Sequence, residues 1–168
     1  MDEEMKPKLR EVKAWLLNAD RIQFSDDHMY YQVNFSRVGS IENEIAEYGL
    51  FDVTFNCKPF QYEDRQVQTI TTTGTKIYNP GTVEALPRMS IYGSGEVTID
   101  INGRDFMVTP AVTVDSELGY AYINLGGIYT PRDDKMAGEL PYFDVGENII
   151  SWTGNVTSID ITYKAVYL

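Results

Sequence analysis

The chain contains one cysteine, Cys57, and one histidine, His28. A single cysteine excludes an intrachain disulfide framework, and one residue of each type excludes a Cys/His metal site. We expect Cys57 to be a small buried hydrophobic side chain, because it lies in an alternating strand pattern. His28 follows Asp26 and Asp27 and is expected at a turn or on the surface. The chain has neither a G-x-S-x-G nor an H-E-x-x-H motif, so the sequence indicates no hydrolase centre of either kind.

Basic residues and long apolar runs are also scarce. The chain has 14 Lys and Arg against 25 Asp and Glu, a formal net charge of −11. This balance disfavours binding to nucleic acid and to anionic membranes. No apolar run approaches the roughly 18 residues of a transmembrane helix. The first residues, MDEEMKPKLR, lack the apolar region of a signal peptide, so we expect none.

The 168 residues, 43% of them hydrophobic, suffice for one domain or two small ones whose core needs no disulfide or metal to stabilise it. Near the N-terminus, Met5, Leu9, Val12 and Leu16 have helical spacing. They predict an amphipathic helix over Lys6–Leu17. Short strands are expected after it over Arg21–Phe24 and over His28–Phe35, where alternation puts Met29, Tyr31, Val33 and Phe35 on one face. A further strand is expected over Ile41–Tyr48.

The stretch Leu50–Tyr62, LFDVTFNCKPFQY, separates two parts of the chain. Apolar and polar residues alternate from Phe51 to Cys57, which predicts a strand with one buried face. Because Pro59 lacks a backbone donor, strand pairing is expected to stop there.

Beyond this stretch, strands recur every 8–12 residues or so, a spacing typical of a sandwich or barrel. In Glu96–Ile101, Val97, Ile99 and Ile101 lie on one face, and Asn102-Gly103 then predicts a tight hairpin with Arg104–Thr109 as the returning strand. On the last strand, Ile159 and Ile161 share one face. Pro87 places the strand Val83–Tyr92 at a sheet edge or a bulge. Thr130–Gly138 is expected to be a charged surface loop, and Gly154-Asn155 to be the turn of the last hairpin.

Two candidate sites compete with structural interpretations. Asp100, Asn102 and Asp105 could supply oxygen ligands to a cation, but a hairpin turn with flanking acids is the simpler interpretation. A β-sandwich lectin would stack sugars on exposed aromatic rings; the available rings are Trp152, Tyr120, Tyr122 and Tyr142. For Trp152 a core role is favoured, because it lies in an apolar strand. A carbohydrate-binding module that recognises envelope glycans therefore stays an alternative, and a glycoside hydrolase is a third.

Several motifs in order resemble the siphophage distal tail protein family. They are the helix ending in Lys13-Ala14-Trp15-Leu16, Ile22–Asp27 followed by Tyr30-Tyr31, the run Phe51-x-Val53-x-Phe55-x-Cys57-x-Pro59-Phe60, Asn79-Pro80-Gly81-Thr82, Ala85-Leu86-Pro87, the 95–103 hairpin, Leu140-Pro141 and Gly146-Glu147-Asn148. The resemblance covers about residues 8–168, and its motifs are structural.

The resemblance implies a mainly β fold. Residues 1–61, a helix plus β-hairpins, would form the C-terminal portion of a ring-forming belt domain. Residues 62–168 would form a galectin-like antiparallel β-sandwich. In the family, further belt strands precede the tryptophan-bearing helix, and this sequence begins just before it. We therefore expect the belt to be incomplete here and the sandwich to be whole.

The same resemblance implies a non-enzymatic virion protein of the phage tail tip that assembles in the host cytoplasm. Its expected partners are identical subunits, which form a hexameric ring where the belt is complete, the tail tube, and tip and receptor-binding proteins. No cofactor, metal, nucleic acid or membrane is implied. The residues expected at the assembly interface are Trp15, Tyr30, Tyr31 and Phe51.

Overall fold

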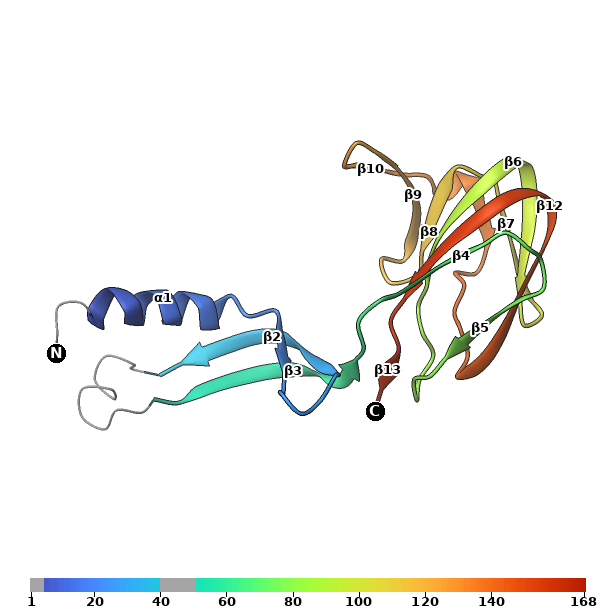
Figure 1. Ribbon diagram of the computed structural model, residues 1–168. Coiled ribbons are helices and arrows are strands. Elements are labelled where there is room, and N and C mark those ends of the chain that lie inside the picture. Colours follow the sequence, from blue (N-terminus) through green and yellow to red (C-terminus); the bar gives the residue numbers. More distant parts are fainter. Residues whose placement is uncertain (1–4, 40–50) are drawn as a thin grey trace. The chain divides into compact units, whose positions relative to one another are not determined.

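The computed structural model describes residues 5–39 and 51–168, so the strand expected over Ile41–Tyr48 lies outside the described residues. The chain divides into two compact units, Met1–Tyr62 and Glu63–Leu168, each described here by itself (Figure 1). The fold is mainly β with one α-helix in the described residues, which confirms the predicted class.

Unit 1 begins with the helix α1, Met5–Leu17, close to the predicted bounds. Leu9 is buried, and the side chain of Asn18 closes the helix by donating to the Ala14 carbonyl at 2.8 Å. Ser36 in the neighbouring sheet donates to the Leu16 carbonyl at 2.8 Å and fixes the helix end against it. Within 5–39 and 51–168, no helix is both long and apolar enough to cross a membrane.

The sheet of unit 1 places β1 (Arg21–Gln23), β2 (Tyr30–Val38) and β3 (Val53–Tyr62) side by side, all antiparallel. The expectation that pairing stops at Pro59 is wrong. Val33 pairs with Cys57 and Tyr31 with Gln61, so a bulge absorbs the proline and the ladder resumes beyond it. Cys57 is half-buried and not buried as expected, because a single helix covers only part of the inner face of this small sheet.

Unit 2 consists of short and long antiparallel strands. They are β4 (Gln66–Ile70), β5 (Thr75–Asn79), β6 (Arg88–Ile101), β7 (Arg104–Val108), β8 (Val112–Asp115), β9 (Tyr120–Leu125), β10 (Ile128–Pro131), β11 (Met136–Gly138), β12 (Gly146–Tyr163) and β13 (Val166–Tyr167), with a 3-10 turn at Asp133–Lys135. In one layer the strand order is β10-β9-β8-β6-β12-β4. In the other layer the strand order is β11-β7-β6-β12-β5 (Figure 1).

The two long strands β6 and β12 belong to both layers and enclose the core. The side chains predicted on one face of β6, Val97, Ile99 and Ile101, are each exposed by 1% or less. From β12, Ile159 and Ile161 are fully buried in the same cluster. Period-2 alternation on half-buried strands thus gave the correct inward face in both.

The hairpin expected at Gly154-Asn155 is wrong, because β12 runs through both residues. The pairing with β6 shifts register at this point, from Thr153 to Asn155 and from Val156 to Ser158. Gly154 has a φ of 96°, and the backbone of β12 passes directly against Gly93 of β6. The glycines therefore form a bend shared by the two strands, where the chain crosses from one layer to the other.

Two other expectations about unit 2 are corrected. The segment after Val83 is not an edge strand: Pro87 lies just before β6, so it removes no ladder bond from a strand that has neighbours on both sides. The segment Thr130–Gly138 is not only a loop, since it contains the end of β10, the 3-10 turn and β11. Asp133 holds this segment to β9 by accepting from the Ala121 amide at 2.8 Å.

Candidate functional site

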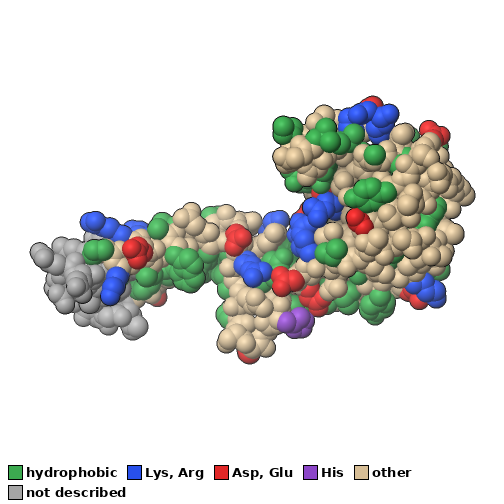
Figure 2. All heavy atoms as spheres, turned by 45° about the horizontal axis from the view of Figure 1, so that its top comes forward, with side chains coloured by type: hydrophobic (Ala, Val, Ile, Leu, Met, Phe, Trp, Pro, Cys, Tyr) green, Lys and Arg blue, Asp and Glu red, His purple; other side chains and the backbone are tan. Residues whose placement is uncertain are grey.

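Unit 1 exposes several large apolar side chains, some of which are visible in Figure 2 as green atoms. They are Val12, Trp15, Leu17, Phe24 and Phe35. Trp15 is 72% exposed, Phe24 59% and Phe35 49%. These side chains come from α1, from the segment after β1 and from β2, and tryptophan is enriched where binding energy concentrates at interfaces. We call these five residues the apolar surface of unit 1.

The four residues predicted at an assembly interface lie in different environments. Trp15 points away from the packed side of α1 and belongs to the apolar surface. Tyr30 is buried: its ring stacks on Tyr62 with centroids 5.8 Å apart, and the Arg21 guanidinium lies 5.3 Å from the Tyr30 ring centroid. Tyr31 and Phe51 are half-buried. Trp15 is thus the residue of the four with the most surface to offer a partner.

The exposure of Phe35 was not predicted, because alternation placed it on the face of Val33. The pairing of β2 with β3 shifts register between Val33 and Phe35, and this bulge reverses the faces. Ser36 points inward in its place and bonds to the helix. Local sequence gives no signal for this bulge.

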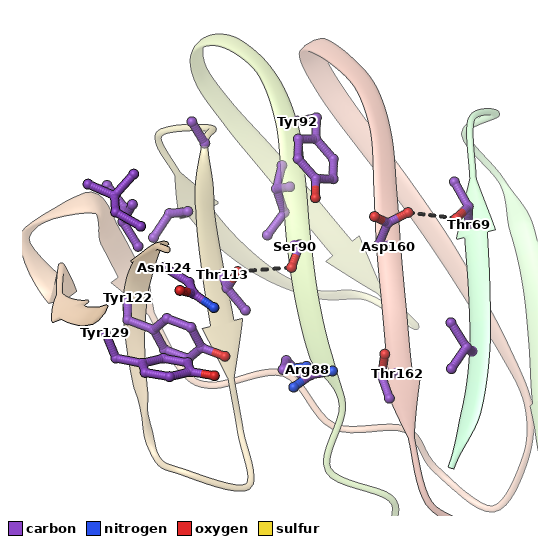
Figure 3. Close-up of a pocket in the computed structure, with 16 residues that line it drawn as sticks. Thr69, Arg88, Ser90, Tyr92, Thr113, Tyr122, Asn124, Tyr129, Asp160 and Thr162 are labelled. Carbon is purple, nitrogen blue, oxygen red and sulfur yellow. Dashed lines mark hydrogen bonds between the residues drawn. The ribbon is translucent and has the colours of Figure 1, made fainter. Parts of the chain in front are cut away.

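Unit 2 carries an open groove of about 710 Å³ on the layer that contains β9, β8, β6, β12 and β4 (Figure 3). We call it the sheet groove. Its lining comes from strands that are up to 95 residues apart in sequence, from Val67 to Thr162. The outward side chains of β6 in the groove are Arg88, Ser90 and Tyr92, which alternate with the buried Met89 and Ile91.

The floor of the sheet groove contains one register row that crosses five strands. Thr69 pairs with Asp160, Asp160 with Ser90, Ser90 with Thr113, and Thr113 with Tyr122. Two hydrogen bonds lie in this row: the Thr69 hydroxyl donates to Asp160 Oδ1 at 2.6 Å, and the Ser90 and Thr113 hydroxyls lie 2.9 Å apart. Hydrogen bonds between neighbours fix these side chains in place before any ligand arrives.

One end of the sheet groove is aromatic. Tyr122 is buried, and its ring meets Tyr129 edge to face with centroids 5.0 Å apart. Burial raises the pKa of Tyr122, and the nearby Asp115 carboxylate raises it further. Tyr129 on β10 remains 53% exposed. A buried ring therefore supports an exposed one at the rim.

Of the rings considered for sugar stacking, Tyr122 is the one among the residues lining the sheet groove. Trp152 is half-buried and packs against the core, as its apolar strand favours. Tyr142 lies under the Arg104 guanidinium, 3.9 Å from the ring centroid, and lines a separate cavity of about 250 Å³. Tyr92 and Tyr129 were missed, because only the sheet register and the β9–β10 hairpin bring them to the groove.

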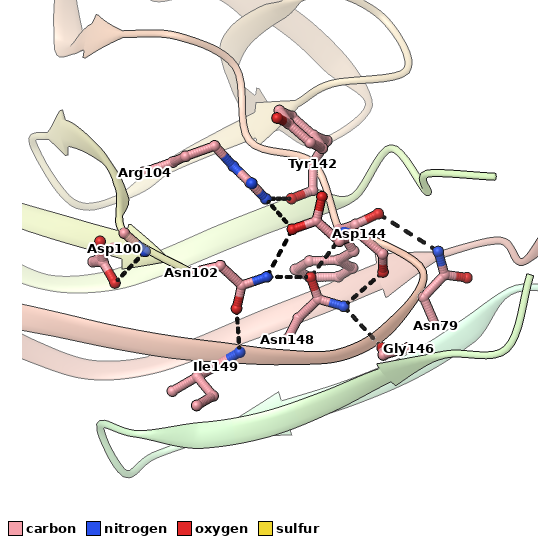
Figure 4. A network of polar contacts seen from close by, with 11 residues as sticks. Asn79, Asp100, Asn102, Arg104, Tyr142, Asp144, Gly146, Asn148 and Ile149 are labelled. Atoms are coloured by element: carbon pink, nitrogen blue, oxygen red, sulfur yellow. Dashed lines mark hydrogen bonds and ion pairs between the residues drawn. The ribbon is translucent and has the colours of Figure 1, made fainter.

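The acidic hairpin at Asp100 and Asn102 is a structural element (Figure 4). Asp100 accepts from the Gly103 amide at 3.2 Å, and Asn102 donates to Asp144 and to Asn148 at 2.9 Å each. Hydrogen bonds from Arg104 and then Asn102 lower the pKa of Asp144. Among the described residues, no group of three His, Cys, Asp or Glu is placed to hold a metal ion.

The chain is therefore mainly β. Its first unit contains a helix and an antiparallel sheet, and its second unit contains two antiparallel layers. The crystal structure of "SPP1 Dit (gp 19.1) Protein, a Paradigm of Hub Adsorption Apparatus in Gram-positive Infecting Phages" has a similar fold, with a TM-score of 0.64 and 17% sequence identity over 99% of this chain and 74% of that one. No family model matches the sequence, and no curated protein matches it. At this identity the likeness concerns the fold.

Proposed function

We propose that this chain is a structural, non-enzymatic component of a siphophage or prophage tail tip, a distal tail hub. The observation that carries the proposal is the likeness of fold over 99% of the chain to a phage hub protein. The sequence motifs from Trp15 to Asn148 resemble those of the siphophage distal tail protein family and also support the proposal.

Unit 1 would supply the belt contacts of a ring, hexameric in the complete assembly. Its apolar surface is suited to packing against a neighbouring copy, with Trp15 as the anchor and Tyr30, Tyr31 and Phe51 supporting the sheet behind it. Unit 2 would serve as the galectin-like sandwich that presents surfaces to tip and receptor-binding proteins. The net charge of −11 would limit adhesion of DNA to such a ring. The protein would reside in the virion after assembly in the host cytoplasm.

The contribution of Trp15 to association can be bounded. A buried tryptophan covers about 150–250 Å², and apolar burial yields about 25 cal/mol per Å². Since 72% of Trp15 is exposed in the single chain, its burial would stabilise each contact by about 3–5 kcal/mol at most. Losses of about 2–4 kcal/mol are typical when such an anchor is truncated.

The test is the concentration dependence of oligomeric state, measured by light scattering after size exclusion and by native mass spectrometry. We expect the chain to self-associate and Trp15→Ala to weaken association at least about tenfold. Tyr78→Ala is the matched control, because Tyr78 is 65% exposed but lies in unit 2. A chain that stays monomeric at all concentrations and binds neither tail-tube nor tip proteins would contradict the hub assignment. Equal association of the Trp15 variant and wild type would contradict the role of this surface.

A further inference from the structure

The sheet groove has a chemical character that the hub role does not account for. Hydrogen bonds between cross-strand neighbours are common on sheet faces, but here hydroxyls and a carboxylate form an ordered row on a concave floor beside exposed aromatic rings. Its volume of about 710 Å³ lies within the range of about 300–1,000 Å³ found for small-ligand sites. A few convergent polar groups beside aromatic rings are typical of such sites.

The row retains hydrogen-bonding capacity toward a ligand. Thr69 occupies Oδ1 of Asp160, which leaves Oδ2 to accept from a ligand hydroxyl. Ser90 and Thr113 share one hydrogen between them, so the pair has one further hydroxyl hydrogen to donate and lone pairs to accept. Two residues along β6 from Ser90, Arg88 adds fixed donors. Alternating donors and acceptors on a rigid floor match a ligand that is rich in hydroxyl groups.

The charge in the sheet groove indicates a neutral ligand. Among the described residues that line it, Arg88 is the basic one and Asp160 the acidic one, so their formal charges cancel. An anionic ligand would also have to approach a chain with a net charge of −11. Strand addition by a peptide requires a free sheet edge, but the groove lies on the face of a layer whose central strands are paired on both sides.

Exposed rings complete the arrangement. Tyr129 at the rim is 53% exposed and Tyr92 is 46% exposed, while the buried Tyr122 supports Tyr129 from behind (Figure 3). A flat aromatic face packs well against the C–H face of a sugar ring, whose hydroxyls then point toward the polar floor. We propose that the sheet groove binds a short neutral oligosaccharide, with Tyr129 as the stacking ring and Asp160 as the main acceptor. This inference rests on the groove alone and does not require the hub role.

The test uses the full chain, labelled with ¹⁵N, in NMR titrations against neutral tri- and tetrasaccharides. The panel covers glucose, galactose, rhamnose, N-acetylglucosamine and N-acetylgalactosamine oligomers at millimolar concentration, which suffices to detect binding with a Kd of about 1 mM or below. We expect at least one member to bind saturably and to shift amide signals of β6, β8 and β12. A panel without a saturable member overturns the proposal.

Two variants locate the site without disturbing the fold. Tyr129→Ala removes an exposed ring, and Asp160→Asn keeps an oxygen that can accept from Thr69 while removing the charge of the carboxylate. Each is expected to weaken binding at least about tenfold. The matched controls, Tyr78→Ala and Asp105→Asn, lie outside the groove and should bind like wild type.

Unchanged affinity in both groove variants would place the glycan elsewhere and overturn the assignment. Binding of a second copy of this chain in the groove would give a different result. If no glycan binds and the amides of β6 and β12 become protected from hydrogen exchange as the protein concentration rises, the groove is an interface between copies and the proposal fails.

Discussion

Asn148→Asp should strongly destabilise unit 2, although it changes one atom. Asn148 is fully buried on β12 and uses its whole hydrogen-bonding capacity (Figure 4). Its amide nitrogen donates to the carbonyls of Asp144 at 2.9 Å and Gly146 at 3.0 Å. Its oxygen accepts from the Asp144 amide at 2.8 Å and from the Asn102 side chain at 2.9 Å.

The aspartate would keep both accepted bonds and lose both donated ones. An ionised oxygen would then face two carbonyl oxygens out of contact with water. Leaving a buried charge uncompensated typically costs about 3–5 kcal/mol. For a unit of this size, that corresponds to a fall in melting temperature of at least about 10 °C.

The sign of the pH dependence follows from the same geometry. Burial and the two carbonyls raise the pKa of the introduced carboxyl above its unfolded value of about 3.9. The variant is therefore closest to wild type below that unfolded pKa, where the carboxyl is protonated in both states. Its deficit grows as the pH rises toward the folded pKa.

The assay is calorimetric or circular-dichroism melting of the Asn148→Asp variant and wild type from pH 4 to pH 7. The control is Asn124→Asp, because Asn124 is exposed and accepts from the Gly127 amide through an oxygen that aspartate retains. We expect the control to melt like wild type. A buried variant that melts within a degree or two of wild type at pH 7, or with a deficit that does not change with pH, would refute the reasoning.

Three further predictions follow from single contacts. Gly93→Ala should destabilise the bend by more than about 2 kcal/mol, because its Cβ would overlap a backbone oxygen of β12; denaturant unfolding measures this. Asp144→Asn should cost less than about 1 kcal/mol at neutral pH, since the Arg104–Asp144 pair is half-exposed, and the difference from wild type should vanish as the pH falls through the lowered pKa of Asp144. Burial, with a hydrogen bond to Glu63, raises the pKa of Tyr167 to about 12, so ultraviolet titration should show one fewer late-ionising tyrosine in Tyr167→Phe.

Short-range sequence patterns correctly predicted the helices and strands that depend on those patterns alone. Helical spacing predicted α1, and alternation with Asn102-Gly103 predicted β7 and the second half of β6 with the correct inward faces. Prediction from local sequence failed where one sequence pattern is compatible with two structures. Gly154-Asn155 has the composition of a turn, but the same residues can form a bend in a continuous strand, and only pairing with β6 decides between them.

The amino-acid sequence by itself determined the class of fold, the absence of an intrachain disulfide and the acidic charge, because each depends on composition or short-range periodicity. Tertiary structure decided the register row from Thr69 to Tyr122 and the outward turn of Phe35. The physical reason is that a strand's neighbours and its bulges are chosen by packing between distant segments. A shift of one residue exchanges the two faces, and this leaves no trace in the local sequence.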